Sequence, residues 1–167
     1  RDSITGWPGG KPHANLPGHP ERSEPFPKRI LLFSPHPDDD IISMGGTFQR
    51  LHDQGHQVHV AYQTSGNIAV TDEFVTRYLD FAVGFQSIAG INHKKSTEIL
   101  QESRRFLARK KSNQTDTKTI RSIKGLIRRG EARATCRYVG IPETNMHFMD
   151  LPFYETGAIE KKPLGKK

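Results

Sequence analysis

The chain has 167 residues and a formal net charge of +7, a length that allows one domain with its own hydrophobic core. Its apolar runs all fall short of the roughly 18 residues that a membrane-spanning helix requires, and no signal peptide is recognisable, so we expect no membrane association. The sole cysteine, Cys136, excludes an internal disulfide and indicates a cytoplasmic protein in which this side chain packs within a helix.

Residues 1–27 are rich in proline and glycine and predict a linker or an extended arm. Two histidines of this segment, His13 and His19, are therefore interpreted as linker residues and not as metal ligands. We assign residues 28–167 to one α/β domain.

A short apolar run at residues 30–33 predicts a buried strand of a parallel sheet, spanning 29–34. One imidazole and three carboxylates follow this strand: His36, Asp38, Asp39 and Asp40. In open α/β sheets, ligands bind in the crevice outside the carboxyl ends of the strands. The position of these side chains therefore suits a site of chemistry.

Three consecutive carboxylates favour a bound cation. A helix that starts near Asp40 gains from a capping carboxylate and tolerates another in its first turn, because its free amides carry partial positive charge. A third carboxylate exceeds that need, whereas zinc accepts imidazole nitrogen and carboxylate oxygen and keeps one position open for water in catalytic sites. From these residues alone, a metal site and an acidic helix start both stay open.

The motif H-P-D-D-D at residues 36–40, with G-G-T at residues 45–47, resembles the signature of LmbE-like proteins, the PIG-L family of zinc-dependent de-N-acetylases. The resemblance implies a Rossmann-like three-layer α/β sandwich with a mainly parallel sheet. It also implies that His36 and Asp39 bind zinc or another divalent metal, and that Asp38 is the catalytic base. In this family a glutamate is usual at the position of Asp40.

The third metal ligand of the family, from a later H-x-x-H motif, has no suitable counterpart here. The local match, His56 and His59, opens the second predicted strand and so belongs to the opposite edge of the sheet from His36. Fewer strands are predicted than the family carries: 29–34, 57–64 and 146–151. We therefore expect the fold to be incomplete at its C-terminus and the third ligand to lie beyond Lys167.

Apolar residues at helical spacing predict one helix between the first two strands, from about Asp40 to Gly55. Gly45 and Gly46 oppose helix propensity within it, which suggests either a close approach of the backbone to the first strand or to a ligand, or a poor helix former tolerated for packing.

The turn after the second predicted strand resembles the T-x-G turn of the family. It contains Ser65, Gly66 and Asn67, with Asn67 at a position where an acid is common. We expect these small polar residues to lie beside His36 and to contact the substrate.

Residues 71–140 form a strongly basic, mostly helical region, with helices predicted at 96–111 and 116–139. Most of the cations fit ordinary solvated helix faces. No aromatic interleaving or nucleic-acid motif accompanies them, so we expect no nucleic-acid partner. The run R-R-G-E at 128–131 resembles an R-x-x-E motif of the family, in which the arginine lines the substrate pocket, so Arg128 is a predicted substrate contact.

The function implied by the resemblance is a metal-dependent hydrolase that removes an N-acetyl (acyl) group from an amino-sugar derivative. We expect this activity of a longer intact protein, with the 167-residue chain alone poorly active. The alternative is a catalytically silent binding or assembly module. Residues 1–27 resemble the junction that follows a glucosamine-6-phosphate deaminase-like domain, so such an upstream domain is an expected partner, and homo-oligomers stay open. Nucleotide binding is disfavoured because no G-x-G-x-x-G follows a strand.

Overall fold

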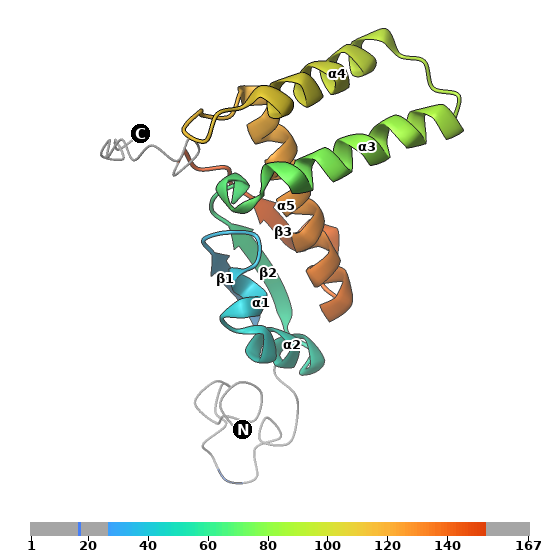
Figure 1. Cartoon of the computed structure of the whole chain (residues 1–167). Helices are drawn as coiled ribbons and strands as arrows, with labels where there is room; N and C mark the ends of the chain where they lie inside the picture. Colours follow the sequence, from blue (N-terminus) through green and yellow to red (C-terminus); the bar gives the residue numbers. More distant parts are fainter. Residues whose placement is uncertain (1–16, 18–26, 153–167) are drawn as a thin grey trace. The chain divides into compact units, whose positions relative to one another are not determined.

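The computed structural model of the chain (Figure 1) describes residue 17 and residues 27–152. The predicted linker at 1–27 lies almost entirely outside this part. The chain divides into two compact units, which we describe in turn: residues 1–63 with 131–150, and residues 64–130 with 151–167. Among the described residues, no helix is both long and apolar enough to cross a membrane.

The first unit contains a sheet of three parallel strands in the order β1-β2-β3: β1 (Arg29–Ser34), β2 (Gln57–Tyr62) and β3 (Met146–Phe148). Ser34 is level with Tyr62 on β2, which in turn is level with Phe148 on β3. The parallel sheet and the alternation of strands with helices confirm the predicted Rossmann-like α/β class. The strand predicted at 146–151 is shorter, and Asp150 beyond it has a positive φ of 47° that an extended strand excludes.

The prediction that β1 is buried is wrong for one of its faces. Leu32 and Ser34 are buried, whereas Leu31 and Phe33 on the other face are 50% and 61% exposed. Successive side chains of a strand point to opposite faces of the sheet, so only one face of β1 is covered within the described part of the chain.

The single helix predicted after β1 is interrupted. The structure has α1 (Asp39–Ile42) and α2 (Gly45–Asp53), and Met44 between them leaves the helical region with φ −146°. A Cβ on Gly45 would lie 2.8 Å from Cδ1 of Ile41, so the missing side chain lets the two helices meet closely. The close neighbour of this glycine is therefore α1, whereas the sequence predicts the first strand or a ligand.

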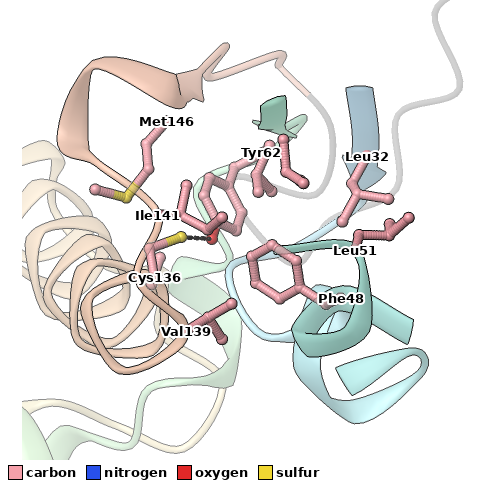
Figure 2. Close-up of a cluster of buried hydrophobic side chains, with 11 residues drawn as sticks. Leu32, Phe48, Leu51, Tyr62, Cys136, Val139, Ile141 and Met146 are labelled. Atoms are coloured by element: carbon pink, nitrogen blue, oxygen red, sulfur yellow. Dashed lines mark hydrogen bonds between the residues drawn. The ribbon is translucent and has the colours of Figure 1, made fainter. Parts of the chain in front are cut away.

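The core of the first unit lies between the covered face of the sheet, α2 and the last turns of α5 (Lys118–Val139) (Figure 2). Phe48 and Leu51 come from α2, and Ala132, Cys136 and Val139 recur at helical spacing on α5. Each fully buried large apolar side chain contributes roughly 1.5–3 kcal/mol to folding. Cys136 is fully buried in this core, in agreement with its predicted packing role.

The second unit is built from helices: η3 (Asn67–Ala69), α3 (Asp72–Ile88), α4 (Lys94–Arg109) and the first turns of α5. A further short helix, η4 (Glu143–Asn145), belongs to the first unit. Val70, Val75, Leu79 and Ile127 form the buried core of the second unit, with partly buried side chains from α4 packed against it.

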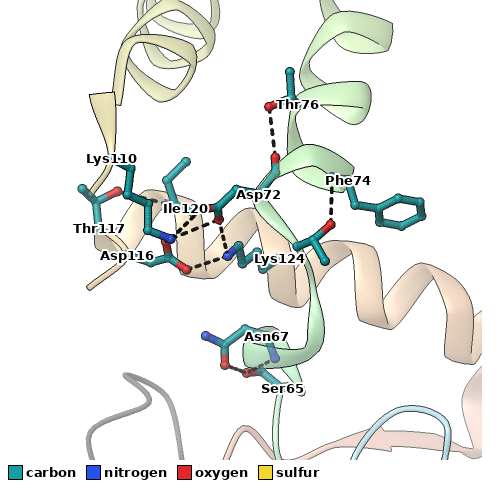
Figure 3. A network of polar contacts seen from close by, with 11 residues as sticks. Ser65, Asn67, Asp72, Phe74, Thr76, Lys110, Asp116, Thr117, Ile120 and Lys124 are labelled. Atoms are coloured by element: carbon teal, nitrogen blue, oxygen red, sulfur yellow. Dashed lines mark hydrogen bonds and ion pairs between the residues drawn. The ribbon is translucent and has the colours of Figure 1, made fainter. Parts of the chain in front are cut away.

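Four charged residues form an ion cluster in the second unit (Figure 3): Asp72, Lys110, Asp116 and Lys124. Nζ of Lys124 lies 2.7 Å from Asp72 and 2.8 Å from Asp116, and Nζ of Lys110 contacts the same two carboxylates. The cluster joins the first turn of α3, the residue after α4 and both sides of the start of α5. It therefore fixes the arrangement of three helices within this unit.

Candidate active site

The candidate site begins where β1 ends. His36 lies in the turn between β1 and α1, and its backbone N–H donates to Oδ2 of Asp39 at 2.9 Å. The ring nitrogen Nδ1 of His36 lies 3.0 Å from the same oxygen, and both side chains are partly exposed. The structure thus brings together the two predicted metal ligands at one solvent-accessible point.

The separation of these two donors suits a shared metal ion. Two ligand atoms that each lie about 2.0–2.1 Å from zinc in a tetrahedron are about 3.3 Å apart. The distance of 3.0 Å between Nδ1 and Oδ2 is close to this value. When Nδ1 carries a proton, it instead donates to Asp39 and leaves Nε2 as the metal-facing atom. In either tautomer the pair presents an imidazole nitrogen beside a carboxylate.

The pair is not joined by a third ligand in the described part of the chain. Across residue 17 and residues 27–152, no three His, Cys, Asp or Glu side chains form a group that could hold a metal ion. The prediction that the third ligand lies beyond Lys167 stays a prediction. His56 immediately precedes β2 and accepts a hydrogen bond from the N–H of Lys28, whereas His59 lies on β2 and stacks on His147 of β3.

Asp38, the predicted base, is the N-cap residue of α1 and is half-buried. Its carbonyl accepts the first hydrogen bonds of the helix, from Ile41 and Ile42. Its carboxylate does not cap the helix, and the residue lies in the chain between His36 and Asp39. The role of Asp38 as the base stays a prediction.

Asp40, the third carboxylate, is buried and serves a structural role that the sequence did not reveal. The Tyr62 hydroxyl donates to its Oδ2 at 2.9 Å, and its own N–H donates to Oγ of Ser34 at 3.1 Å. The Tyr62 oxygen also lies 3.4 Å from Sγ of Cys136 (Figure 2). Asp40 therefore ties α1 to β1 and β2, and holds the turn that carries the two candidate ligands.

The surroundings of Asp40 perturb three titratable groups. Burial raises the pKa of the Asp40 carboxyl, although hydrogen bonds from Tyr62, the backbone and Ser34 act in the opposite direction. Burial also raises the pKa of the Tyr62 hydroxyl and of the Cys136 thiol. Both groups are therefore protonated at neutral pH, so Tyr62 can donate to Asp40.

The predicted substrate contacts belong to the second unit. Gly66 has a left-handed backbone (φ 64°), and Ser65 donates to the Asn67 side chain at 2.8 Å across this turn (Figure 3). Ser65 packs against Gly125 of α5, where an added Cβ would lie 3.5 Å from that of Ser65. Arg128 follows one helical turn later and is 9% exposed. The expectation that Ser65, Gly66 and Asn67 lie beside His36 stays a prediction, and so does the substrate contact of Arg128.

Comparisons with known proteins identify the family of the chain and two of its relatives. The family described as PIG-L, GlcNAc-PI de-N-acetylase, matches residues 31–165. A glucosamine-6-phosphate deaminase-like protein of Bacteroides thetaiotaomicron is 55% identical over 167 residues, which cover 98% of this chain and 25% of the relative. Diacetylchitobiose deacetylase of Thermococcus kodakarensis is 42% identical over 52 residues, 30% of this chain and 20% of the relative. No solved structure matches the chain significantly.

Proposed function

This chain belongs to the PIG-L family of GlcNAc-PI de-N-acetylases, and from this premise we propose that it carries the metal-binding turn of a hydrolase that removes the acetyl group from an N-acetyl amino-sugar derivative. The observation that carries the proposal is the His36–Asp39 pair, with its donors 3.0 Å apart at the carboxyl end of a parallel strand.

The proposal gives a separate role to each of three residues: His36, Asp38 and Asp39. His36 and Asp39 would hold zinc or another divalent cation, which would lower the pKa of water and polarise the acyl carbonyl. Asp38 accepts the proton of the attacking water, whose oxygen bonds to the carbonyl carbon, and passes this proton to the amine nitrogen as the C–N bond breaks. The products are acetate and the free amino sugar.

The substrate class rests on the second unit and on the relatives. Arg128, Ser65 and Asn67 offer the guanidinium, hydroxyl and amide groups that hydrogen-bond to sugar hydroxyls. Gly66 keeps the turn that carries Ser65 and Asn67. One curated relative is named for the deacetylation of diacetylchitobiose, an acetylated amino sugar. The N-acetyl amino sugars are therefore the first substrates to test.

The chain spans about a quarter or less of the length of the curated relatives that it matches. The activity of a whole protein that contains it is thus part of the proposal. The name of the Bacteroides relative supports a glucosamine-6-phosphate deaminase-like domain upstream, where an amine released by deacetylation would be a substrate of related chemistry.

A second function is favoured by one observation. Within the described residues the pair lacks a third ligand, as expected for a module that binds or assembles without hydrolysis. A protein that folds fully, contains no metal and leaves every N-acetyl amino sugar intact would establish this second function.

Asp38→Asn and Asp39→Asn separate the base from the ligands. Asn at position 38 cannot accept a proton, so turnover should fall by about 10²–10⁴-fold while the metal is retained. Asn at position 39 is a poor ligand, so the metal should be lost together with activity. The measurement is metal content and deacetylation of a panel of N-acetyl amino sugars for both variants.

Two outcomes of this experiment contradict the proposal. Loss of metal from Asp38→Asn with full retention in Asp39→Asn would reverse the two roles. Unchanged turnover in both variants would remove the turn from catalysis.

A further inference from the structure

A buried serine lies at the end of β1, next to the candidate metal site. On the covered face of this strand Ile30 and Leu32 are apolar, whereas the third side chain, Ser34, is polar and only 1% exposed. A buried hydroxyl without hydrogen bonds is costly, so its partners indicate its role. Its two shorter hydrogen bonds both run to residues 36–40, which carry the candidate ligands and which we call the ligand turn.

The Ser34 hydroxyl bonds to both ends of the ligand turn. It donates to the carbonyl oxygen of His36 at 2.6 Å and accepts from the N–H of Asp40 at 3.1 Å. The carboxylate of Asp40 is a poorer acceptor for the same proton, because its Oδ1 lies 3.5 Å away. A hydroxyl has one proton to donate, and here it goes to the residue that supplies the candidate imidazole ligand. One buried oxygen atom therefore holds the first and the last residue of the turn.

The bond from Asp40 to Ser34 also serves as a cap for α1. The first N–H groups of a helix have no partners within it, and the side chain of the N-cap residue usually accepts from the second or third of them. Asp38 is the N-cap residue of α1, but its side chain does not cap the helix. Asp40 is the second residue of α1, and its N–H bonds to the strand residue instead. Ser34 therefore fixes the start of α1 to the end of β1.

Within the ligand turn, the backbone of His36 links the two candidate ligands. Its carbonyl also accepts from the N–H of Asp38 at 2.8 Å and of Asp39 at 3.3 Å, and its N–H donates to the Asp39 carboxylate at 2.9 Å. The backbone of His36 is thus held on both sides by contacts within the chain. A ligand pair that is already held in place loses less conformational freedom when an ion binds.

We propose that Ser34 is a positioning residue, which sets the metal affinity of the His36–Asp39 pair by holding the ligand turn in its binding geometry. This inference rests on the proposed function, because it takes these two side chains as the ligands. Ser34 acts through the backbone of His36 and the first turn of α1, and not as a ligand. The loss of contacts that orient metal ligands typically lowers metal affinity by about 10–100-fold. We expect the lower end of this range, because Ser34 bonds to the backbone of His36 and not to its ring.

Amide hydrogen exchange of the metal-free 167-residue chain is the first test. If Ser34 holds the ligand turn, the amides of His36 and Asp40 exchange slowly before zinc is added, and Ser34→Ala speeds their exchange by about tenfold or more. Val139→Ala is the matched control. It destabilises the same core, where Val139 is 2% exposed, but keeps the Ser34 hydroxyl, so it should speed these two amides less. Rapid exchange of both amides in the metal-free wild type would show that Ser34 does not hold the turn, and would overturn the proposal.

Zinc titration by calorimetry is the second test. Ser34→Ala should bind zinc about tenfold more weakly than the wild type, whereas Val139→Ala should bind it as the wild type does. Both variants are compared where circular dichroism shows them folded, so a loss of stability alone cannot produce the difference. Equal zinc affinity of Ser34→Ala and the wild type, or equal weakening by the two variants, would overturn this inference and leave the proposed function intact. A wild-type chain that binds no zinc would contradict the proposed function, and this inference with it.

Discussion

Asp38, Asp39 and Asp40 follow one another in the chain but lie in three different surroundings. Asp39 is partly exposed and contacts the imidazole of His36, Asp38 is the N-cap residue of α1, and Asp40 is 2% exposed and bonded to Tyr62. An accessible carboxylate can exchange water for a cation or a proton, whereas a buried one depends on its hydrogen-bond partners. We therefore expect these three aspartates to have different roles, because they differ in burial and in hydrogen-bond partners.

Tyr62→Phe tests the role of Asp40 as an anchor. The substitution keeps the buried ring and removes the hydroxyl that donates to Asp40. A buried carboxylate then loses a hydrogen bond without gaining water, so the free energy of unfolding should fall by about 1–3 kcal/mol. Urea unfolding measures the loss, with Tyr138→Phe at an exposed position as the control. Equal stability of Tyr62→Phe and the wild type would show that Asp40 does not need this bond.

The sequence predicted that His36 and Asp39 lie together, but it did not predict the contacts of Tyr62 with Asp40 and Cys136 that support this turn. His36 and Asp39 are three residues apart in one turn, so their proximity follows from local spacing. The contacts of Tyr62 join residues that are 22 and 74 positions away in the chain. Hydrophobic periodicity reports only on neighbours along a strand or helix and cannot show such contacts.

At the scale of secondary structure, α5 contributes to both compact units. Its first turns carry Lys124 of the ion cluster, and its last turns carry Cys136 and Val139 of the sheet core. Its helical period predicted the element from the apolar residues alone. The ion cluster could not be predicted, because the surplus of basic residues in this region gave no sign of which lysine is buried.

The ion cluster makes stability depend on pH through Asp72. Burial acts to raise the pKa of this carboxyl, but hydrogen bonds and attraction from Lys110 and Lys124 outweigh it, and the net pKa is below the ordinary 3.8. A lowered pKa in the folded state stabilises the protein above pH 3.8, and this contribution is lost as the pH falls through the folded-state value. Acid should therefore weaken the second unit through this residue.

Asp72→Asn measures that contribution. At neutral pH we expect the free energy of unfolding to fall by about 1–2 kcal/mol, a modest value because the Asp72 side chain is 40% exposed. The difference from the wild type should shrink as the pH falls below 3.8. Asp80→Asn on the same helix breaks the exposed pair with Arg104 and should have a smaller effect. A difference between Asp72→Asn and the wild type that does not change in acid would contradict this account.

The interruption between α1 and α2 shows where local sequence reasoning fails. Ile41, Phe48 and other apolar residues keep a helical period across the break, so one helix was predicted. The break comes at Met44, whose φ of −146° leaves the helical region. Apolar periodicity indicates which side chains are buried and does not report the backbone angles of one residue.

At the scale of the whole molecule, the described residues hold part of what the family fold implies. Within the described residues, only one face of the sheet is covered at β1, whereas helices cover both faces of the sheet in a three-layer sandwich. The candidate metal site has two donors, whereas catalytic zinc sites use three protein ligands. A chain of this family that spans a quarter of one relative's length is consistent with both observations.

A zinc titration of the 167-residue chain by calorimetry tests whether His36 and Asp39 hold the metal. Two ligands hold zinc more weakly than three, so we expect weak, one-to-one binding that His36→Ala abolishes. His59→Ala is the matched control, because the ring nitrogens of His59 and His147 lie 3.1 Å apart and are a second place where two side chains could hold the ion. Zinc binding that survives His36→Ala and disappears in His59→Ala would place the ion on the sheet and contradict the account.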